Sequence, residues 1–152
     1  NAGKTIRRGL ELYGSKETDS YKAVFSYSYS DFIFDSYVVD GLTFDGNNLP
    51  AVPKHHAFLS FKYKFTPTIG GEIKSKHVGL FFADDKNNNE VEGYSIFQFR
   101  IWKDFKNYNL YVGANNLFNK KYFDNIRINA FANRFYEPAP MRNYYAGINF
   151  KI

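Results

Sequence analysis

Hydrophobic and polar residues alternate along most of this chain with a period of two. In "YKAVFSYSYS", residues 21–30, the odd positions carry tyrosine, alanine or phenylalanine, and the even positions carry mainly serine and lysine. Successive side chains of a β-strand point to opposite faces, so this stretch predicts a strand with one aromatic face and one small polar face. The fourth such segment alternates poorly, and we expect a bulge near Gly79. The predicted strands span residues 5–14, 21–30, 56–65, 69–82, 94–102, 108–114 and 144–152.

The connections between these strands alternate between short and long. Short links such as "SKETD", "TPT" and "DFKN" alternate with long ones at about residues 31–55, 83–93 and 119–143. A membrane barrel with tight turns at one rim and large loops at the other produces this alternation. Strands of about 10 residues also match a tilted crossing of a bilayer. The sequence therefore predicts an all-β fold, an antiparallel transmembrane β-barrel wall of about seven strands.

A soluble β-sandwich is the alternative to a barrel wall. Its aromatic faces would form the core between two sheets, or would stack on sugars in a secreted carbohydrate-binding module. Strands in soluble sandwiches are usually about 5 or 6 residues long, which favours the barrel.

Composition narrows the possible functions. Aromatic residues make up 20% of the 152 residues, and these rings must be buried or must face something other than water. The net charge is +5, but the basic residues are scattered, so we predict no nucleic-acid binding. The chain has no cysteine, which excludes disulfides and thiolate metal sites. No Ser-His-Asp arrangement, paired-carboxylate motif or glycine-rich phosphate loop is present, so we expect neither an enzyme nor a bound cofactor.

The segment "VGANNLFNKKYFDN", residues 112–125, resembles a motif of TonB-dependent outer-membrane receptors, in which a late strand ends in "v-x-N-L-F-[DN]-K-x-Y". The matching residues are Asn116, Leu117, Phe118, Asn119, Lys120 and Tyr122. Four further segments resemble the family in the expected order: "RGLEL", "LPAVPKHHAFLSFKYKF", "ADDKNNNEVEGYSIFQF" and "EPAPMRNYYAGINF". Two features depart from the family pattern. Met141 stands where glycine is usual, and in the ending "NFKI" the aromatic Phe150 comes two places early.

The resemblance implies that residues 1–152 are the C-terminal segment of a barrel of about 22 strands, with the plug domain and the earlier strands absent from this chain. It implies a location in the outer membrane of a Gram-negative bacterium and import of a scarce nutrient, without catalysis. The expected partners are outer-membrane lipid, the remainder of the receptor, TonB acting through the plug, and the imported ligand. "NAFANRFYEPAPMRN" resembles the siderophore-type branch more than the glycan-importing branch, so a ferric siderophore is the expected ligand.

The last long connection carries the candidate substrate-binding residues Arg127, Arg134 and Tyr136. In the resembled fold this loop overhangs the substrate entrance, where arginines would attract an anionic ferric siderophore. The alternative is that these side chains are solvated or pack the loop. The sequence leaves both possibilities open.

The histidines could contribute to a metal site, but we predict that they do not. His55 and His56 follow a proline and are adjacent, whereas His77 is remote in sequence, so we interpret the pair as solvated residues at a loop exit.

The segment "DDKNNNE", residues 84–90, is the second possible metal site. Asp85, Asn87 and Asn89 have the spacing of a calcium loop, but Glu90 stands where the turn needs glycine and Ile96 where the bidentate glutamate belongs. We therefore predict a hydrophilic extracellular loop and no metal site.

Overall fold

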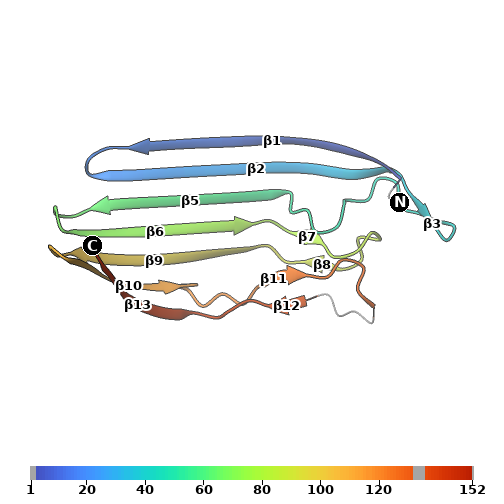
Figure 1. Ribbon diagram of the computed structural model, residues 1–152. Helices are drawn as coiled ribbons and strands as arrows, with labels where there is room; N and C mark the ends of the chain where they lie inside the picture. The colour runs from blue at the N-terminus through green and yellow to red at the C-terminus, as the bar shows by residue number, and fades with distance from the viewer. Residues whose placement is uncertain (1–2, 132–135, 152) are drawn as a thin grey trace.

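The computed structural model describes residues 3–131 and 136–151, and within them the long strands form one antiparallel sheet of seven strands (Figure 1). The strands of this main sheet are β1 (Lys4–Glu17), β2 (Tyr21–Ser36), β5 (His55–Lys64), β6 (Ile69–Val78), β9 (Tyr94–Asp104), β10 (Tyr108–Asn115) and β13 (Asn143–Phe150). They lie side by side in chain order, from β1 at one edge to β13 at the other. Each predicted strand thus has a counterpart in the main sheet, although β2 extends to Ser36 rather than ending at residue 30, and β6 ends before the predicted residue 82.

The two rims of the main sheet differ as the spacing of the strands predicts. At the tight-turn rim, residues 18–20, 65–68 and 105–107 connect neighbouring strands. Two of these turns share one device. The hydroxyl of Thr18 accepts a hydrogen bond from the Tyr21 N–H at 3.1 Å, and that of Thr66 accepts one from the Ile69 N–H at 3.0 Å. The opposite end is the long-loop rim.

Each long loop contains a short hairpin that the sequence does not predict. The hairpins pair β3 (Val38–Val39) with β4 (Leu42–Thr43), β7 (Phe81–Phe82) with β8 (Glu90–Val91), and β11 (Phe123–Ile126) with β12 (Tyr136–Pro138). Between β3 and β4, Asp40 and Gly41 both have positive φ, as a tight two-residue hairpin turn requires. The long connections are therefore folded back on themselves.

The predicted single strand over residues 69–82 is wrong, because β6 ends at Val78 and β7 pairs with β8 outside the main sheet. The registers of β6 with β5 and with β9 run without a shift, so the predicted bulge near Gly79 is also wrong. The N–H of Gly79 donates to the carbonyl of His55 at 2.7 Å. A Cβ at this position would lie 3.1 Å from the backbone N and O of His55, so the close approach of the two chains favours glycine.

The register gives the main sheet an apolar face and a polar face. One row across the apolar face consists of Ala23, Phe61, Ile73, Phe99, Ala114 and Tyr144. The adjacent row on the polar face consists of Lys22, Lys62, Glu72, Arg100, Gly113 and Tyr145. The apolar face is open, with Phe61 40% and Ile73 42% exposed. Within the described residues no second large sheet covers it, so the sandwich alternative is not favoured.

Large aromatic rings on the polar face lie over glycines of the neighbouring strand. Trp102 lies over Gly70, Tyr145 over Gly113, and Tyr111 over Gly147, and the two members of each pair are direct partners in the register. A Cβ at any of these glycines would collide with the ring. Glycine therefore provides the space that each ring occupies above the neighbouring strand.

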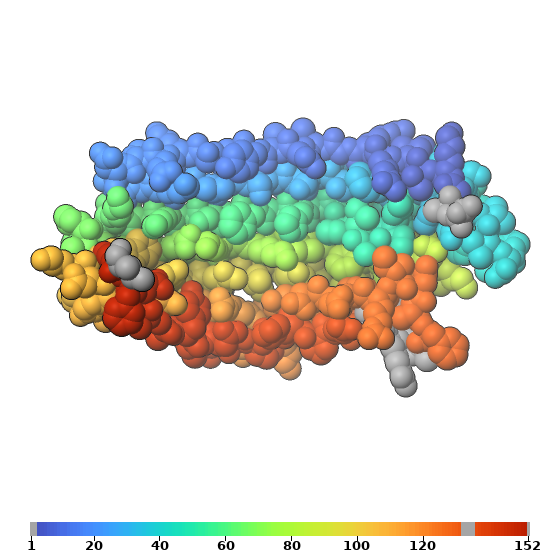
Figure 2. All heavy atoms as spheres, in the orientation of Figure 1, coloured from blue at the N-terminus to red at the C-terminus, as the bar shows by residue number. Residues whose placement is uncertain are grey.

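The buried core lies at the long-loop rim, where the ends of β6 and β9 meet the long loops. Its members are Val78, Phe81, Ala83, Val91, Tyr94 and Ile96. Tyr122, Ile126 and Ala130 of the last long loop pack against this core. Figure 2 shows the residues of the long loops gathered at one end of the molecule. Among the described residues, no helix is long and apolar enough to cross a membrane.

Candidate functional site at the long-loop rim

Residues 84–89 join two long loops through side-chain hydrogen bonds. Oδ1 of Asp84, which is 7% exposed, accepts hydrogen bonds from the N–H groups of Asn88 and Asn89, so the segment closes on itself. Oδ1 of Asn87 accepts from the Asn48 N–H at 2.7 Å, and Nδ2 of Asn87 donates to the Asn48 carbonyl at 2.9 Å. Asn87 has a φ of 56°, a left-handed conformation that asparagine adopts more readily than most residues. The segment therefore fixes the loop between β2 and β5.

The same segment also holds the last long loop. Oδ1 of Asn129 accepts a hydrogen bond from the Asp85 N–H at 3.0 Å, and its Nδ2 donates to Oδ2 of Asp85 at 2.8 Å. The Asn129 N–H donates to the carbonyl of Ala83 at 2.9 Å. The amides and carboxylates of "DDKNNNE" thus bind backbone and asparagine groups, and they connect all three long loops into one unit.

An aromatic cleft lies beside this unit, between the second and third long loops. Its volume is about 250 Å³. The residues that line it are Glu90, Glu92, Gly93, Tyr94, Lys120, Lys121, Tyr122, Phe123 and Tyr136. The rings of Tyr94 and Tyr122 have centroids 4.4 Å apart, and those of Phe123 and Tyr136 are 4.8 Å apart. Two ring pairs and two lysines therefore surround a small space.

The phenol of Tyr122 remains a hydrogen-bond donor at neutral pH. Burial raises the pKa of Tyr122, and the nearby Asp124 carboxylate raises it further. The Tyr136 hydroxyl donates to the carbonyl of Glu90 at 3.2 Å, which joins β12 to β8.

Of the predicted substrate-binding residues that the structure describes, Tyr136 lines the cleft and Arg127 does not. Tyr136 lines the aromatic cleft, together with Tyr122 of the family motif. Arg127 lies outside the cleft lining, and its Nε contacts Oε1 of Glu137 at 3.2 Å. Arg134 lies outside the described residues. The sequence also did not predict that Tyr94, Phe123 and the two lysines line the cleft.

The family motif after β10 forms the turn that carries the last long loop. Asn116, 3% exposed and at a φ of 47°, holds the Lys120 backbone through its side-chain oxygen and nitrogen at 2.9 and 2.8 Å. Its Nδ2 also lies 3.3 Å from the carbonyl of Pro140. The Leu117 N–H donates to the carbonyl of Phe97, and the ring of Phe118 packs edge-on against that of Phe97. Apart from Lys120 and Tyr122, which line the cleft, the motif residues position the loop.

Met141 occupies its turn without needing the conformation of glycine. It is not among the described residues with positive φ, and the turn is closed by a hydrogen bond from the Arg142 N–H to Oδ1 of Asn119 at 3.0 Å. The glycine that is usual in the resembled family is therefore not required here.

The three histidines have different surroundings. Nδ1 of His55 lies 2.9 Å from the Tyr27 hydroxyl, and Nδ1 of His77 lies 2.9 Å from the Ser95 hydroxyl. His56 follows His55 in the same strand and so points to the opposite, polar face. Within residues 3–131 and 136–151, no group of three His, Cys, Asp or Glu side chains could hold a metal ion.

Residues 1–117 match the family described as "TonB dependent receptor-like, beta-barrel". The chain belongs to this family. It is therefore part of an outer-membrane barrel wall. In the barrel of a TonB-dependent receptor, the apolar face of the wall contacts lipid and the polar face lines the lumen. The tight-turn rim is then periplasmic and the long-loop rim extracellular.

A curated relative is the probable TonB-dependent siderophore receptor PiuA of Acinetobacter baumannii, which is 29% identical over 164 residues. The match covers 99% of this chain and 21% of PiuA, so the chain spans about a fifth of that receptor. The crystal structure of the siderophore receptor PiuA from the same species superposes with a TM-score of 0.83 at 26% identity, covering 96% of this chain and 22% of that one.

Two other solved structures share the fold at lower identity. The ferric-catecholate import receptor Fiu from E. coli K12, in its closed form, gives a TM-score of 0.80 at 18% identity, over 96% of this chain and 21% of Fiu. The copper transporter OprC gives 0.73 at 21% identity, over 97% of this chain and 24% of OprC. The shared barrel wall therefore does not by itself determine which cargo a TonB-dependent receptor carries.

Proposed function

We propose that this chain is the C-terminal part of a TonB-dependent receptor that imports a ferric siderophore. The observation that carries the proposal is the similarity to the probable siderophore receptor PiuA, which extends over 99% of the chain and so includes the long loops as well as the strands. In this proposal the earlier barrel strands pair with the free edges of β1 and β13, and a plug fills the lumen. TonB supplies energy through that plug, and the chain itself performs no catalysis.

The aromatic cleft is the part of the chain that we expect to contact the ligand. Its volume of about 250 Å³ is smaller than the roughly 300–1,000 Å³ typical of a complete small-molecule site, so it would take one arm of a chelate. The rings of Tyr94, Tyr122 and Tyr136 offer stacking surfaces and phenolic donors. Lys120 and Lys121 at its edge suit the negative charge of a ferric complex, although Glu90 and Glu92 reduce the net charge there.

The proposal is tested with the complete receptor in a strain that lacks its other iron-uptake receptors. We expect uptake of radioactive iron when it is supplied as a siderophore chelate, with chelates of catecholate and hydroxamate type compared in parallel. Uptake of a copper complex or of cobalamin, with no uptake of any ferric chelate, would overturn the proposal.

Substitutions in the cleft locate the binding contact. Tyr122→Ala and Tyr136→Ala should weaken binding of the imported chelate, since each removes a ring from the cleft. Tyr144→Ala is the matched control, because Tyr144 is 71% exposed on the apolar face of β13 and lies outside the cleft. Equal affinities in all three variants would exclude the cleft as a contact and leave the import proposal to the uptake measurement.

A further inference from the structure

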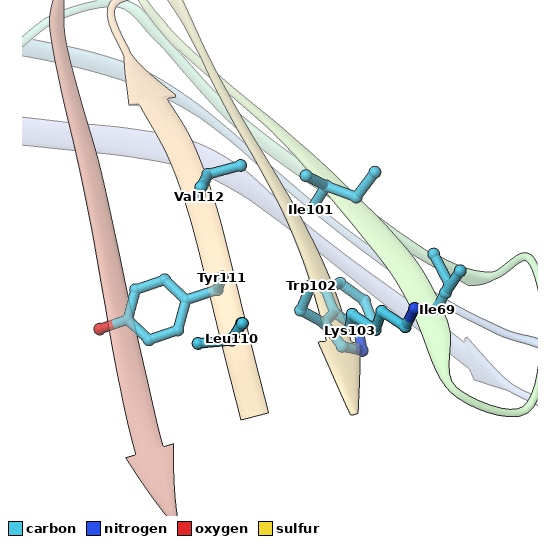
Figure 3. Close-up of a pocket in the computed structure, with 7 residues that line it drawn as sticks. All are labelled: Ile69, Ile101, Trp102, Lys103, Leu110, Tyr111 and Val112. Carbon is cyan, nitrogen blue, oxygen red and sulfur yellow. The ribbon is translucent and has the colours of Figure 1, made fainter. Parts of the chain in front are cut away.

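The apolar face carries a groove between β9 and β10, near the tight-turn rim (Figure 3). Its volume is about 300 Å³, and almost all of its lining is apolar. The lining residues on this face are Ile69, Ile101, Lys103, Leu110 and Val112, with Trp102 and Tyr111 as the intervening residues of the two strands. A second groove of about 560 Å³ shares Val112 and continues along β10 and β13, past Ala114, Ala146 and Tyr144.

The dimensions of this track match one leaflet of a bilayer. From Leu110 to Ala114 the strand rises by four residues, or about 13 Å at about 3.3 Å per residue, which a tilt of about 40° reduces to about 10 Å along the membrane normal. Half of a hydrocarbon core of about 30 Å is about 15 Å. The track therefore begins at the level of the periplasmic headgroups and ends close to the midplane, which is the span of a single acyl chain.

A lysine stands at the headgroup end of the groove. Lys103 lies in the same row as Ile69 and Leu110, one residue before β9 ends, and its side chain is exposed. Its Nζ lies 5.2 Å from the centroid of the Phe105 ring, and among the described carboxylates none is within 4.0 Å of it. A cation on a lipid-facing surface at this depth lies where lipid phosphates lie.

The surrounding charges also favour an anion. Lys106 is exposed in the turn between β9 and β10, and Lys151 follows β13 at the same rim. The negative charge of Asp104 is already paired, since its Oδ1 lies 3.3 Å from Lys151 Nζ and also accepts a hydrogen bond from Nδ2 of Asn109. Lys103 and Lys106 therefore leave an excess of positive charge beside the open end of the groove.

We propose that this groove is a binding site for an anionic phospholipid of the periplasmic leaflet. One acyl chain lies in the track between β9 and β10, and the phosphate binds Lys103. The site rests on the family assignment and on the geometry of the apolar face. It is independent of the cargo, so its failure would leave the import proposal unaffected.

The test uses the complete receptor, released from vesicles of mixed phosphatidylglycerol and phosphatidylcholine and analysed for retained lipid by native mass spectrometry. We expect retained phosphatidylglycerol to exceed phosphatidylcholine, and Lys103→Gln to reduce that preference about fivefold, as expected for one lysine at an anionic surface. Lys16→Gln is the matched control, because Lys16 also lies on the apolar face near the periplasmic rim but does not line the groove.

A groove-filling variant provides a second test. Val112→Trp keeps Lys103 but fills the space shared by the two grooves, so it should lower retention of both lipids. Heat-modifiable migration on a gel verifies that each variant forms a closed barrel. The proposal is overturned if Lys103→Gln retains the wild-type preference, or if Lys16→Gln loses it to the same extent, because attraction would then be a general property of the surface charge.

Discussion

Lysine substitutions at two adjacent residues of β2 should differ sharply in cost. Phe25 lies on the apolar face, opposite Leu59, and its side chain is 43% exposed. Ser26 follows it on the polar face, opposite Phe58 of β5 and Tyr13 of β1. In the complete receptor Phe25→Lys places an ammonium group in lipid, whereas Ser26→Lys places it in the lumen.

The depth of Phe25 sets the magnitude. It lies four residues beyond Tyr21, the first residue of β2 after the tight turn, which corresponds to about 13 Å along the strand. A tilt of about 40° reduces this to about 10 Å along the membrane normal, and the apolar band is about 25 Å tall, so Phe25 lies close to the midplane. A lysine there costs about 2–4 kcal/mol of unfolding free energy. A lysine in a wet environment usually changes stability by no more than about 0.5 kcal/mol.

Denaturant titration of the complete receptor in lipid vesicles measures both costs. Because a soluble protein with a buried aromatic face would show the same ordering, cysteine labelling is needed as well. A lipid-dissolved reagent should label Phe25→Cys, and a water-soluble reagent should prefer Ser26→Cys. Equal costs for the two lysines, or equal labelling of the two cysteines by the lipid-dissolved reagent, would refute the assignment of the faces.

Three further predictions concern the loops and the wall. Asn87→Ala removes three hydrogen bonds to Asn48, which should lower the stability of the loops by about 1–3 kcal/mol and speed proteolysis of the extracellular loops. Asn88→Ala is the control and should not speed proteolysis, because the Asn88 side chain makes none of these hydrogen bonds. Gly113→Val should destabilise the barrel by about 1–3 kcal/mol through collision with Tyr145, whereas Gly14→Val meets open space; equal unfolding midpoints would contradict the packing described. The raised pKa of Tyr122 contributes stability that is complete below about pH 10 and is lost as the pH rises through the pKa in the folded protein. Tyr122→Phe should therefore remove the last-titrating part of the alkaline absorbance titration of the tyrosines, and an unchanged curve would contradict this.

The strands of the main sheet could be predicted because their two faces meet different solvents. Lipid on one side and water on the other require a strict alternation, which "YKAVFSYSYS" displays over ten residues. Residues 69–78 alternate poorly, since the apolar face there carries Gly71 and Ser75. The pattern therefore does not mark where the strand ends, and the predicted strand was wrongly extended through Gly79. The hairpin of β3 and β4 did have a detectable signal, the Asp40-Gly41 dipeptide between short hydrophobic runs.

The aromatic cleft could be predicted only in part. Tyr136 could be predicted from the family resemblance, since the last loop overhangs the substrate entrance in that family. Its neighbour Glu90 comes from the second long loop and Tyr94 from the start of β9, and that loop is joined to the last one by hydrogen bonds between Asp85 and Asn129. Such bonds join residues 39–44 positions apart and leave no periodic pattern in the sequence.

The rings that lie over glycines make the identities of certain positions interdependent. A bulky residue at 70 requires a smaller one at 102, and the same exchange links 113 with 145 and 147 with 111. Across related receptors these positions should therefore covary in pairs. Because the members of each pair lie opposite each other on adjacent strands, such covariation would report strand order and register around the barrel circumference without a structure.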